Sequence, residues 1–180
     1  MKKFLIGLLA VCMVFSAVGC SVLNDVAPQV QPTEKKFSID SYGLQITADS
    51  TFQEKTGGSF DLQITNNDAY ISVMAYPYID LPQDLTPLDV FDMQNEDLFS
   101  KRTAVAVMEE AKTQILSQYT ITQALYSAEN DGNKNYYASY LIDFPDEEVF
   151  AWVLVTAMPS YMERNRESLH NIVCSLTAVE

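Results

Sequence analysis

Histidine is the scarcest chemistry-bearing residue in this chain of 180 residues, because His170 is the only one. A metal site built from several histidines is therefore excluded, and a Ser-His-Asp arrangement would depend on His170 alone. His170 falls late in an expected C-terminal helix, where an imidazole can favour the helix end electrostatically. We interpret His170 as a helix-end or surface residue rather than a catalytic one.

Basic residues are also few. Eleven lysines and arginines stand against 24 acidic residues, which gives a net charge of −13. This balance argues against a nucleic-acid partner, because affinity for nucleic acid comes from basic side chains that neutralise phosphates. It also opposes adhesion to anionic lipid. We interpret the acidity as a source of solubility, with an acidic recognition surface as the alternative.

Cysteine use excludes a disulfide scaffold. Of three cysteines, Cys12 and Cys20 lie in the N-terminal segment, and Cys174 is the only one in the body of the chain. Cys174 lies in an apolar context between Ile172 and Leu176, with no base nearby in the sequence. This favours a small buried hydrophobe over a reactive thiol, which needs electropositive and partly exposed surroundings.

The N-terminus has the organisation of a secretory signal. Lys2 and Lys3 precede an apolar run over residues 4–18, which is shorter than the roughly 18–20 residues of a spanning helix. Ala17-Val18-Gly19-Cys20 resembles a bacterial lipobox. That resemblance implies a signal peptide over 1–19 and a diacylglycerol thioether on Cys20, which becomes the first mature residue. The mature chain would be exported and lipid-anchored on the outer side of the bacterial cell membrane.

Two alternatives to the lipid anchor stay open. Ala17 stands where lipoboxes usually carry leucine, and Ala17 and Gly19 also suit an ordinary signal peptidase, so plain secretion would use the same bond. An uncleaved anchor is disfavoured by the short apolar run. Loss of Lys2 and Lys3 on cleavage would leave nine basic residues against 24 acidic ones.

The rest of the chain divides into a tether and one domain. Residues 20–36 contain two prolines and no sustained periodicity, so they are expected to be a lipidated N-terminus and flexible tether. Residues 37–180 have the size of a single domain with its own core.

Period-two alternation predicts strands at 37–39, 44–47, 60–65, 69–76, 119–127 and 134–144. Asn130-Asp131-Gly132-Asn133 predicts a hairpin between the last two. Thr86-Pro87 predicts a helix start. A further helix is predicted over 103–118, because apolar residues recur there at helical spacing: Ala104, Met108, Ala111 and Ile115.

The segment 149–158 is apolar on both faces, which predicts a strand covered on both sides and therefore central in the sheet. A last helix is predicted after Pro159, with a short closing strand within 175–179. The order of elements predicts an α+β fold: an antiparallel sheet of about six to seven strands with helices packed on both faces.

This pattern resembles the PsbP-like fold, which includes DcrB-like and LpqN-like bacterial lipoproteins. The resemblance rests on element order, on the opening Tyr42-Gly43-Leu44-Gln45-Ile46, and on a terminal helix that runs into Cys174-Ser175-Leu176-Thr177. It covers most of residues 37–180. It implies an accessory or binding protein, and no functional residue is carried over from it.

Tyrosines are frequent on or near the expected strands: Tyr76, Tyr78, Tyr136, Tyr137 and Tyr140. A rigid apolar ring with a polar tip suits interfaces, but it also fills sheet surfaces in ordinary cores. We favour the core for this group as a whole. Tyr76-Pro77-Tyr78 is the candidate contact surface.

No cluster of residues forms a convincing catalytic set, so we predict no enzyme, no cofactor and no resident metal. The acidic groups at 89–97 and 146–148 lack the spacing of a calcium loop and are interpreted as solvated. The leading hypothesis is a non-enzymatic, membrane-tethered binding or accessory lipoprotein of the cell envelope with an envelope protein as partner. A small-ligand or metal-ion binding domain is the alternative, and a carboxylate-based hydrolase is the third candidate.

Overall fold

The computed structural model describes residues 33–116 and 118–179. These residues belong to one compact unit that begins at Thr33. The expected signal peptide, Cys20 and the tether up to residue 32 lie outside the described residues. No helix in the described part of the chain is both long and apolar enough to cross a membrane.

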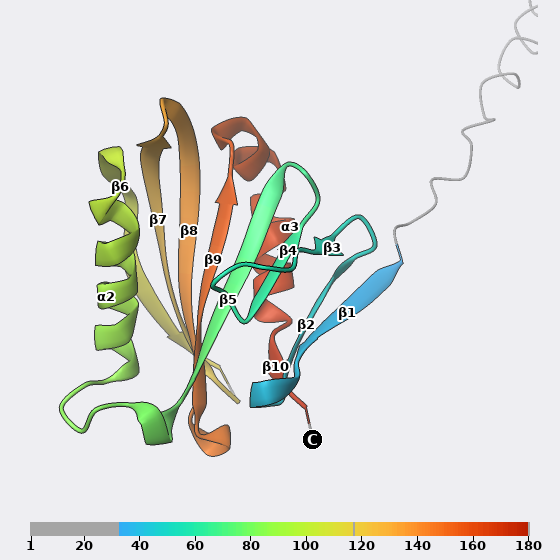
Figure 1. The fold of residues 1–180 in the computed structure, drawn as a ribbon, viewed down its shortest axis with the longest axis vertical. Helices are drawn as coiled ribbons and strands as arrows, with labels where there is room; N and C mark the ends of the chain where they lie inside the picture. Colours follow the sequence, from blue (N-terminus) through green and yellow to red (C-terminus); the bar gives the residue numbers. More distant parts are fainter. Residues whose placement is uncertain (1–32, 117, 180) are drawn as a thin grey trace, which may run out of the picture. The chain divides into compact units, whose positions relative to one another are not determined.

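A seven-stranded antiparallel sheet forms the centre of the unit (Figure 1). Its order is β3-β4-β5-β9-β8-β7-β6, so the last four strands in sequence form a meander. The strands are β3 (Gln53–Glu54), β4 (Leu62–Thr65), β5 (Ala69–Pro77), β6 (Thr103–Ile115), β7 (Thr120–Asn130), β8 (Asn133–Phe144) and β9 (Val149–Ala157). The predicted fold class and strand number are confirmed.

β9 lies in the middle of this sheet, between β5 and β8. Val149, Val153 and Val155 face one core, while Phe150 and Trp152 face the other. A strand that is apolar on both faces is stable only when both faces are covered. The prediction of a central strand over 149–158 is therefore confirmed.

The hairpin of β7 and β8 follows the predicted turn. β7 and β8 pair along their whole length up to Asn130 and Asn133, with Asp131-Gly132 as the two-residue turn. Both turn residues have positive φ, 50° and 77°, which is the backbone that a tight hairpin turn requires. β4 and β5 are joined by the three residues 66–68, of which Asn67 has a φ of 74°.

A smaller sheet holds the two ends of the described chain together. β1 (Glu34–Ile39) and β10 (Thr177–Ala178) both pair with β2 (Leu44–Asp49), in the order β1-β2-β10. β1 begins at Glu34, so the first folded element includes residues 34–36, which the sequence assigns to the tether. Alternate residues of β1 and β2 are buried against the aliphatic core of the large sheet.

Two helices cover opposite faces of the large sheet. α2 (Pro87–Ser100) packs on β8 and β9 over one face, and α3 (Pro159–Cys174) packs on β2, β8 and β9 over the other. Thr86 caps α2 as predicted, in a capping box with Asp89. Three short 3-10 helices complete the fold: η1 (Asp40–Tyr42), η2 (Tyr78–Asp80) and η3 (Pro145–Glu147).

The prediction of a helix over 103–118 is wrong, because Thr103–Ile115 is the edge strand β6. Register shifts interrupt its pairing with β7 at three places, and Ala104 has a φ of 50°. Each β-bulge moves the following residues to the other face, so the alternation typical of a strand is hidden. Pairing with β7 overrides the helical propensity of the alanine, methionine and charged residues in this segment.

Candidate functional site

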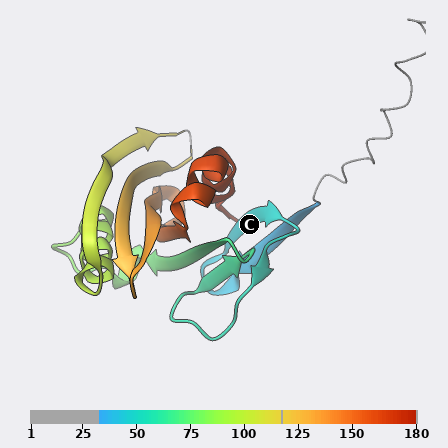
Figure 2. The ribbon, with the colours of Figure 1, turned by 90° about the horizontal axis from the view of Figure 1, so that it is seen from above.

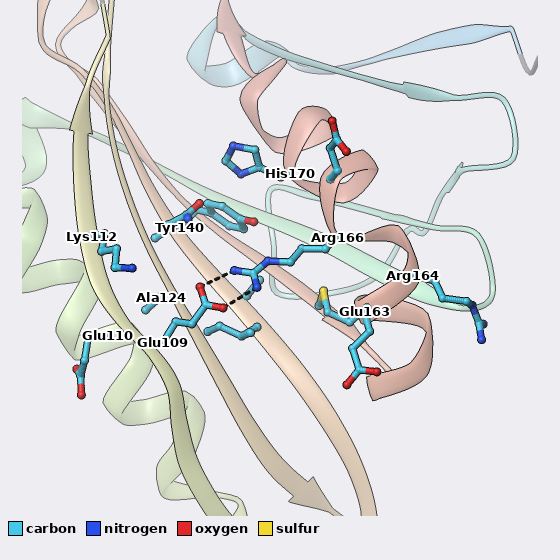
Figure 3. Close-up of a pocket in the computed structure, with 14 residues that line it drawn as sticks. Glu109, Glu110, Lys112, Ala124, Tyr140, Glu163, Arg164, Arg166 and His170 are labelled. Atoms are coloured by element: carbon cyan, nitrogen blue, oxygen red, sulfur yellow. Dashed lines mark hydrogen bonds and ion pairs between the residues drawn. The ribbon is translucent and has the colours of Figure 1, made fainter.

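A cleft of about 450 Å³ lies between α3 and the β6–β8 part of the sheet (Figure 3). Its position follows from the packing. α3 lies over β8 and β9, while in Figure 2 β6 and β7 curve toward the side on which α3 lies. The helix leaves the end of the sheet uncovered on this face, so β6 forms one wall and α3 forms the other.

The floor of the cleft is apolar and its walls are charged. Leu125, Ala138, Tyr140 and Met162 form the floor and are almost fully buried. The charged residues of the walls are Glu109, Glu110 and Lys112 from β6, and Glu163, Arg164, Arg166 and Glu167 from α3. In Figure 3, Glu110 and Arg164 point away from the space between the two walls.

An ion pair crosses the cleft. The two terminal nitrogens of Arg166 each donate to one carboxylate oxygen of Glu109, at 2.5 Å, which is the bidentate geometry that a guanidinium favours. The hydrogen bonds from Arg166 lower the pKa of Glu109, and Lys112 lowers that pKa further. The same pair raises the pKa of Arg166. The Glu109 side chain is 35% exposed and that of Arg166 is 50% exposed, so water and solutes can reach both.

Tyr140 and His170 line the cleft on the other side of this pair. Their ring centroids lie 5.8 Å apart. Burial is the main cause that raises the pKa of Tyr140 to about 12. Burial, and secondarily the charge of Arg166, lowers the pKa of His170, so the imidazole is neutral at pH 7. The expectation of a plain helix-end role for His170 overlooks that its ring lines the cleft.

Cys174 lies one helical turn after His170, and its Sγ is 3.3 Å from Nε2 of that residue. The expectation of no nearby base overlooks His170, because a four-residue spacing in the predicted helix brings the two side chains together. Burial nevertheless raises the pKa of the Cys174 thiol, and the neutral imidazole supplies no positive charge to lower it. Both groups are held uncharged, which favours packing over thiolate chemistry.

Tyr76 and Tyr78, the candidate contact surface, lie far from the cleft on the α2 face of the sheet. Both rings pack on Phe150, with centroids 5.2 and 5.5 Å from it. Tyr78 also donates its hydroxyl to Asp143 at 2.6 Å, and burial together with this bond raises its pKa. These contacts give both rings a role inside the fold, and a contact with a partner there stays a prediction.

Two residues of the first acidic group have local partners, and the second group lies at a turn. Asp89 caps α2, Asp97 pairs with Lys101 at 2.8 Å, and residues 145–147 form η3. Within residues 33–116 and 118–179, no three histidine, cysteine, aspartate or glutamate side chains are close enough to hold a metal ion.

Reasoning from the sequence missed the cleft. Glu109 and Arg166 are 57 positions apart, and the assignment of residues 103–118 to a helix placed Glu109 and Lys112 on a solvent-facing helix surface. The β-branched residues of the segment, at 103, 105, 107, 113 and 115, are the signal that favours a strand there.

The chain was compared with families, curated proteins and solved structures. No family model and no curated protein matches it. The cyanobacterial PsbP of Synechocystis has a TM-score of 0.62 at 10% identity, over 88% of this chain and 99% of that one. LpqN of Mycobacterium tuberculosis, described as involved in cell envelope biogenesis, has a TM-score of 0.59 at 13% identity, over 82% and 91%. The Ran-binding protein Mog1p of Saccharomyces cerevisiae has a TM-score of 0.56 at 12% identity, over 83% and 97%.

These similarities extend over nearly the whole length of each solved chain. At such low sequence identity they indicate a shared fold and not shared chemistry. They agree with the element order on which the resemblance rested, from the opening strands to the terminal helix. The described residues therefore share the fold of these structures, as the resemblance to the PsbP-like fold predicted.

Proposed function

We propose that this protein is a lipid-anchored, non-catalytic binding protein of the bacterial cell envelope, and that it takes a small ligand in the cleft between β6 and α3. The observation that carries the proposal is the cleft itself. It combines an apolar floor with charged groups that face one another from two different elements. Its volume of about 450 Å³ lies in the range of roughly 300–1,000 Å³ that is typical of small-ligand sites.

The distribution of charge supports a ligand site here. In a chain with a net charge of −13 and only 11 basic residues, Lys112 and Arg166 both face this one cleft. Lys112 and Arg166 lie on opposite walls of the cleft. Solubility alone requires only charges that are scattered over the surface, so it does not explain why these two cations face one space. Gathering scarce cations around an apolar floor is what recognition of a polar solute requires.

The location within the cell is supported by the sequence and by one structural neighbour. The sequence at 17–20 resembles a lipobox, and this resemblance, with the proline-containing segment after it, supports an anchored envelope protein. A diacylglycerol supplies two acyl chains, which hold a protein at a membrane where one chain gives only marginal binding. A protein described as involved in cell envelope biogenesis shares the fold.

Mass spectrometry of the mature N-terminus tests the anchor. We expect the mature chain to begin at Cys20 and to carry the mass of a diacylglycerol on it. An unmodified Cys20 would instead support plain secretion, which uses the same bond.

A cleft-filling variant tests the ligand site. Gln123 lies on β7 and lines the cleft, so Gln123→Trp should occupy the space that the ligand needs. Gln53→Trp makes the same substitution on the exposed strand β3, outside the cleft, and is the matched control. The measurement is the shift in Tm caused by the small-molecule fraction of a bacterial envelope extract, because a ligand of the native state raises its stability.

We expect the extract to raise the Tm of the wild type and of Gln53→Trp, and to leave that of Gln123→Trp unchanged. Equal shifts in all three proteins would place the ligand elsewhere. No shift in the wild type would contradict the small-ligand site.

A further inference from the structure

Each wall of the cleft carries both signs of charge. Glu109 and Lys112 project from β6, and Arg166 meets Glu109 from α3, close to the Tyr140 ring (Figure 3). Glu163 and Glu167 also line the α3 side. Apart from Glu110 and Arg164, which point away from the space, three carboxylates and two cationic side chains line the cleft. A ligand with a single charge would meet a repelling group beside every attracting one.

The Glu109–Arg166 pair has the form of an occupied recognition site. The guanidinium already holds a carboxylate with two parallel hydrogen bonds, which is the arrangement that it would offer to the carboxylate of a ligand. Both side chains are exposed by a third or more, so the pair contributes little stability and can be exchanged at low cost.

Exchange has different consequences for different ligands. A carboxylate that takes Arg166 leaves Glu109 without that partner, unless the same ligand also brings a cation. An ammonium that binds Glu109 leaves Arg166 without its carboxylate partner, unless the same ligand also brings an anion. A ligand that carries both groups replaces one ion pair with two and leaves neither side chain unpaired.

The floor adds a requirement for an apolar body. Leu125, Tyr140 and Met162 line the cleft and are nearly fully buried, so the surface that they still present is small and apolar, and an apolar group of the ligand gains mainly by leaving water itself.

We propose that the ligand of this cleft is a small dipolar molecule of the amino acid or short peptide class, whose carboxylate binds Arg166, whose ammonium binds Glu109, and whose apolar side chain lies on the floor. The inference rests on the proposed function, because it identifies the ligand of the same cleft. Lys112 stays beside Glu109 and screens it from the ligand carboxylate.

Isothermal titration of the mature protein with matched compounds tests this. The compounds are L-phenylalanine, 3-phenylpropanoate, which lacks the ammonium, 2-phenylethylamine, which lacks the carboxylate, and the dipeptide L-phenylalanyl-L-leucine. We expect a dipolar compound to bind at least about tenfold more tightly than either singly charged analogue, since each lost charge-assisted bond weakens binding by about that factor. In the amino acid and in the dipeptide, the ammonium and the carboxylate are separated by different distances. Their relative affinity therefore shows whether the cleft takes amino acids or short peptides.

Two variants assign the charges. Arg166→Gln should remove the preference for the dipolar compound over 2-phenylethylamine, and Glu109→Gln should remove the preference over 3-phenylpropanoate. Asp97→Asn and Lys101→Gln break the other ion pair of the described residues, which is exposed on α2 and away from the cleft, and they should change nothing.

A singly charged analogue that binds as tightly as the dipolar compounds would overturn the inference. The inference would also be overturned if none of the four compounds binds while the envelope extract still stabilises the wild type but not Gln123→Trp. The proposed function would survive that result. If neither the panel nor the extract has an effect, both proposals fall.

Discussion

The two faces of the seven-stranded sheet are each covered by one helix, yet they are built from different side chains. On the α2 face, half of the buried residues of the core are aromatic: Phe91, Tyr137, Phe150 and Trp152. On the α3 face the core is mostly aliphatic, with valines and isoleucines from β5 and β9 packed against α3 and the small sheet. β9 contributes to both cores through alternate residues.

Polar groups are also used differently on the two faces. Under α2, Trp152 donates its indole N–H to Ser139 at 2.9 Å, and Ser139 donates to Asn95 at 2.6 Å, all within the buried core. Under α3, the polar groups lie at the margin, where Glu109 and Arg166 meet in an open cleft. Broad aromatic rings fill the first face, while the second leaves space between the helix and the sheet edge. The α2 face is thus a closed support, and the α3 face has room for a ligand.

The largest expected effect is on the closed face. Phe150 is fully buried beneath Tyr76 and Tyr78, so Phe150→Ala should lower the free energy of unfolding by about 3–5 kcal/mol, through lost burial and the cavity left behind. Urea unfolding measures the loss, with the milder Phe150→Leu in reserve if the alanine variant does not fold. Ile115→Ala, at a residue 85% exposed on β6, should stay within about 0.5 kcal/mol of the wild type. Similar losses in both variants would remove the contrast.

A smaller effect is expected from the buried polar chain. Ser139 is fully buried, and Ser139→Ala removes the acceptor of the Trp152 indole and the donor to Asn95. Leaving these groups without partners should cost about 1–3 kcal/mol. Combining it with Asn95→Ala should be clearly non-additive, since both act on one network. Additive losses in denaturant unfolding would show that the three residues do not act together.

The smallest effect is expected at the cleft. Glu109→Gln should cost less than about 1 kcal/mol at neutral pH, because the ion pair is partly exposed and screened. Arg166 lowers the pKa of Glu109 in the folded state, so the unfolded state takes up the proton first as the pH falls. The stabilisation is therefore present above the unfolded-state pKa and is lost as the pH falls through the folded-state value. The difference between wild type and Glu109→Gln should vanish there, and a difference that persists in acid would contradict the assignment.

The predictability of the fold from the sequence follows the same division. The closed face and the central strand could be predicted, because Val149–Ala157 is apolar on both faces and Asp131-Gly132 marks a tight hairpin. Local chemistry also identified the start of α2 at Thr86. These features depend on short stretches of chain with a regular period.

The cleft could not be predicted because it depends on an irregular strand and on a pairing across 57 positions. The bulges in β6 hide its period, and its alanines, methionine and charged residues suit a helix when considered alone. The contact between His170 and Cys174, in contrast, follows from the predicted terminal helix, because a four-residue spacing in a helix brings two side chains together.

The irregular pairing of β6 also bears on how molecules of this protein meet one another. An exposed edge strand of 13 residues would normally be a template on which a second chain could add a strand. In β6 the longest run of regular register is Lys112–Ile115, and bulges bend the strand elsewhere. A neighbouring copy would find only a short stretch of regular backbone to pair with, so the irregular edge opposes the growth of a sheet from one molecule to the next.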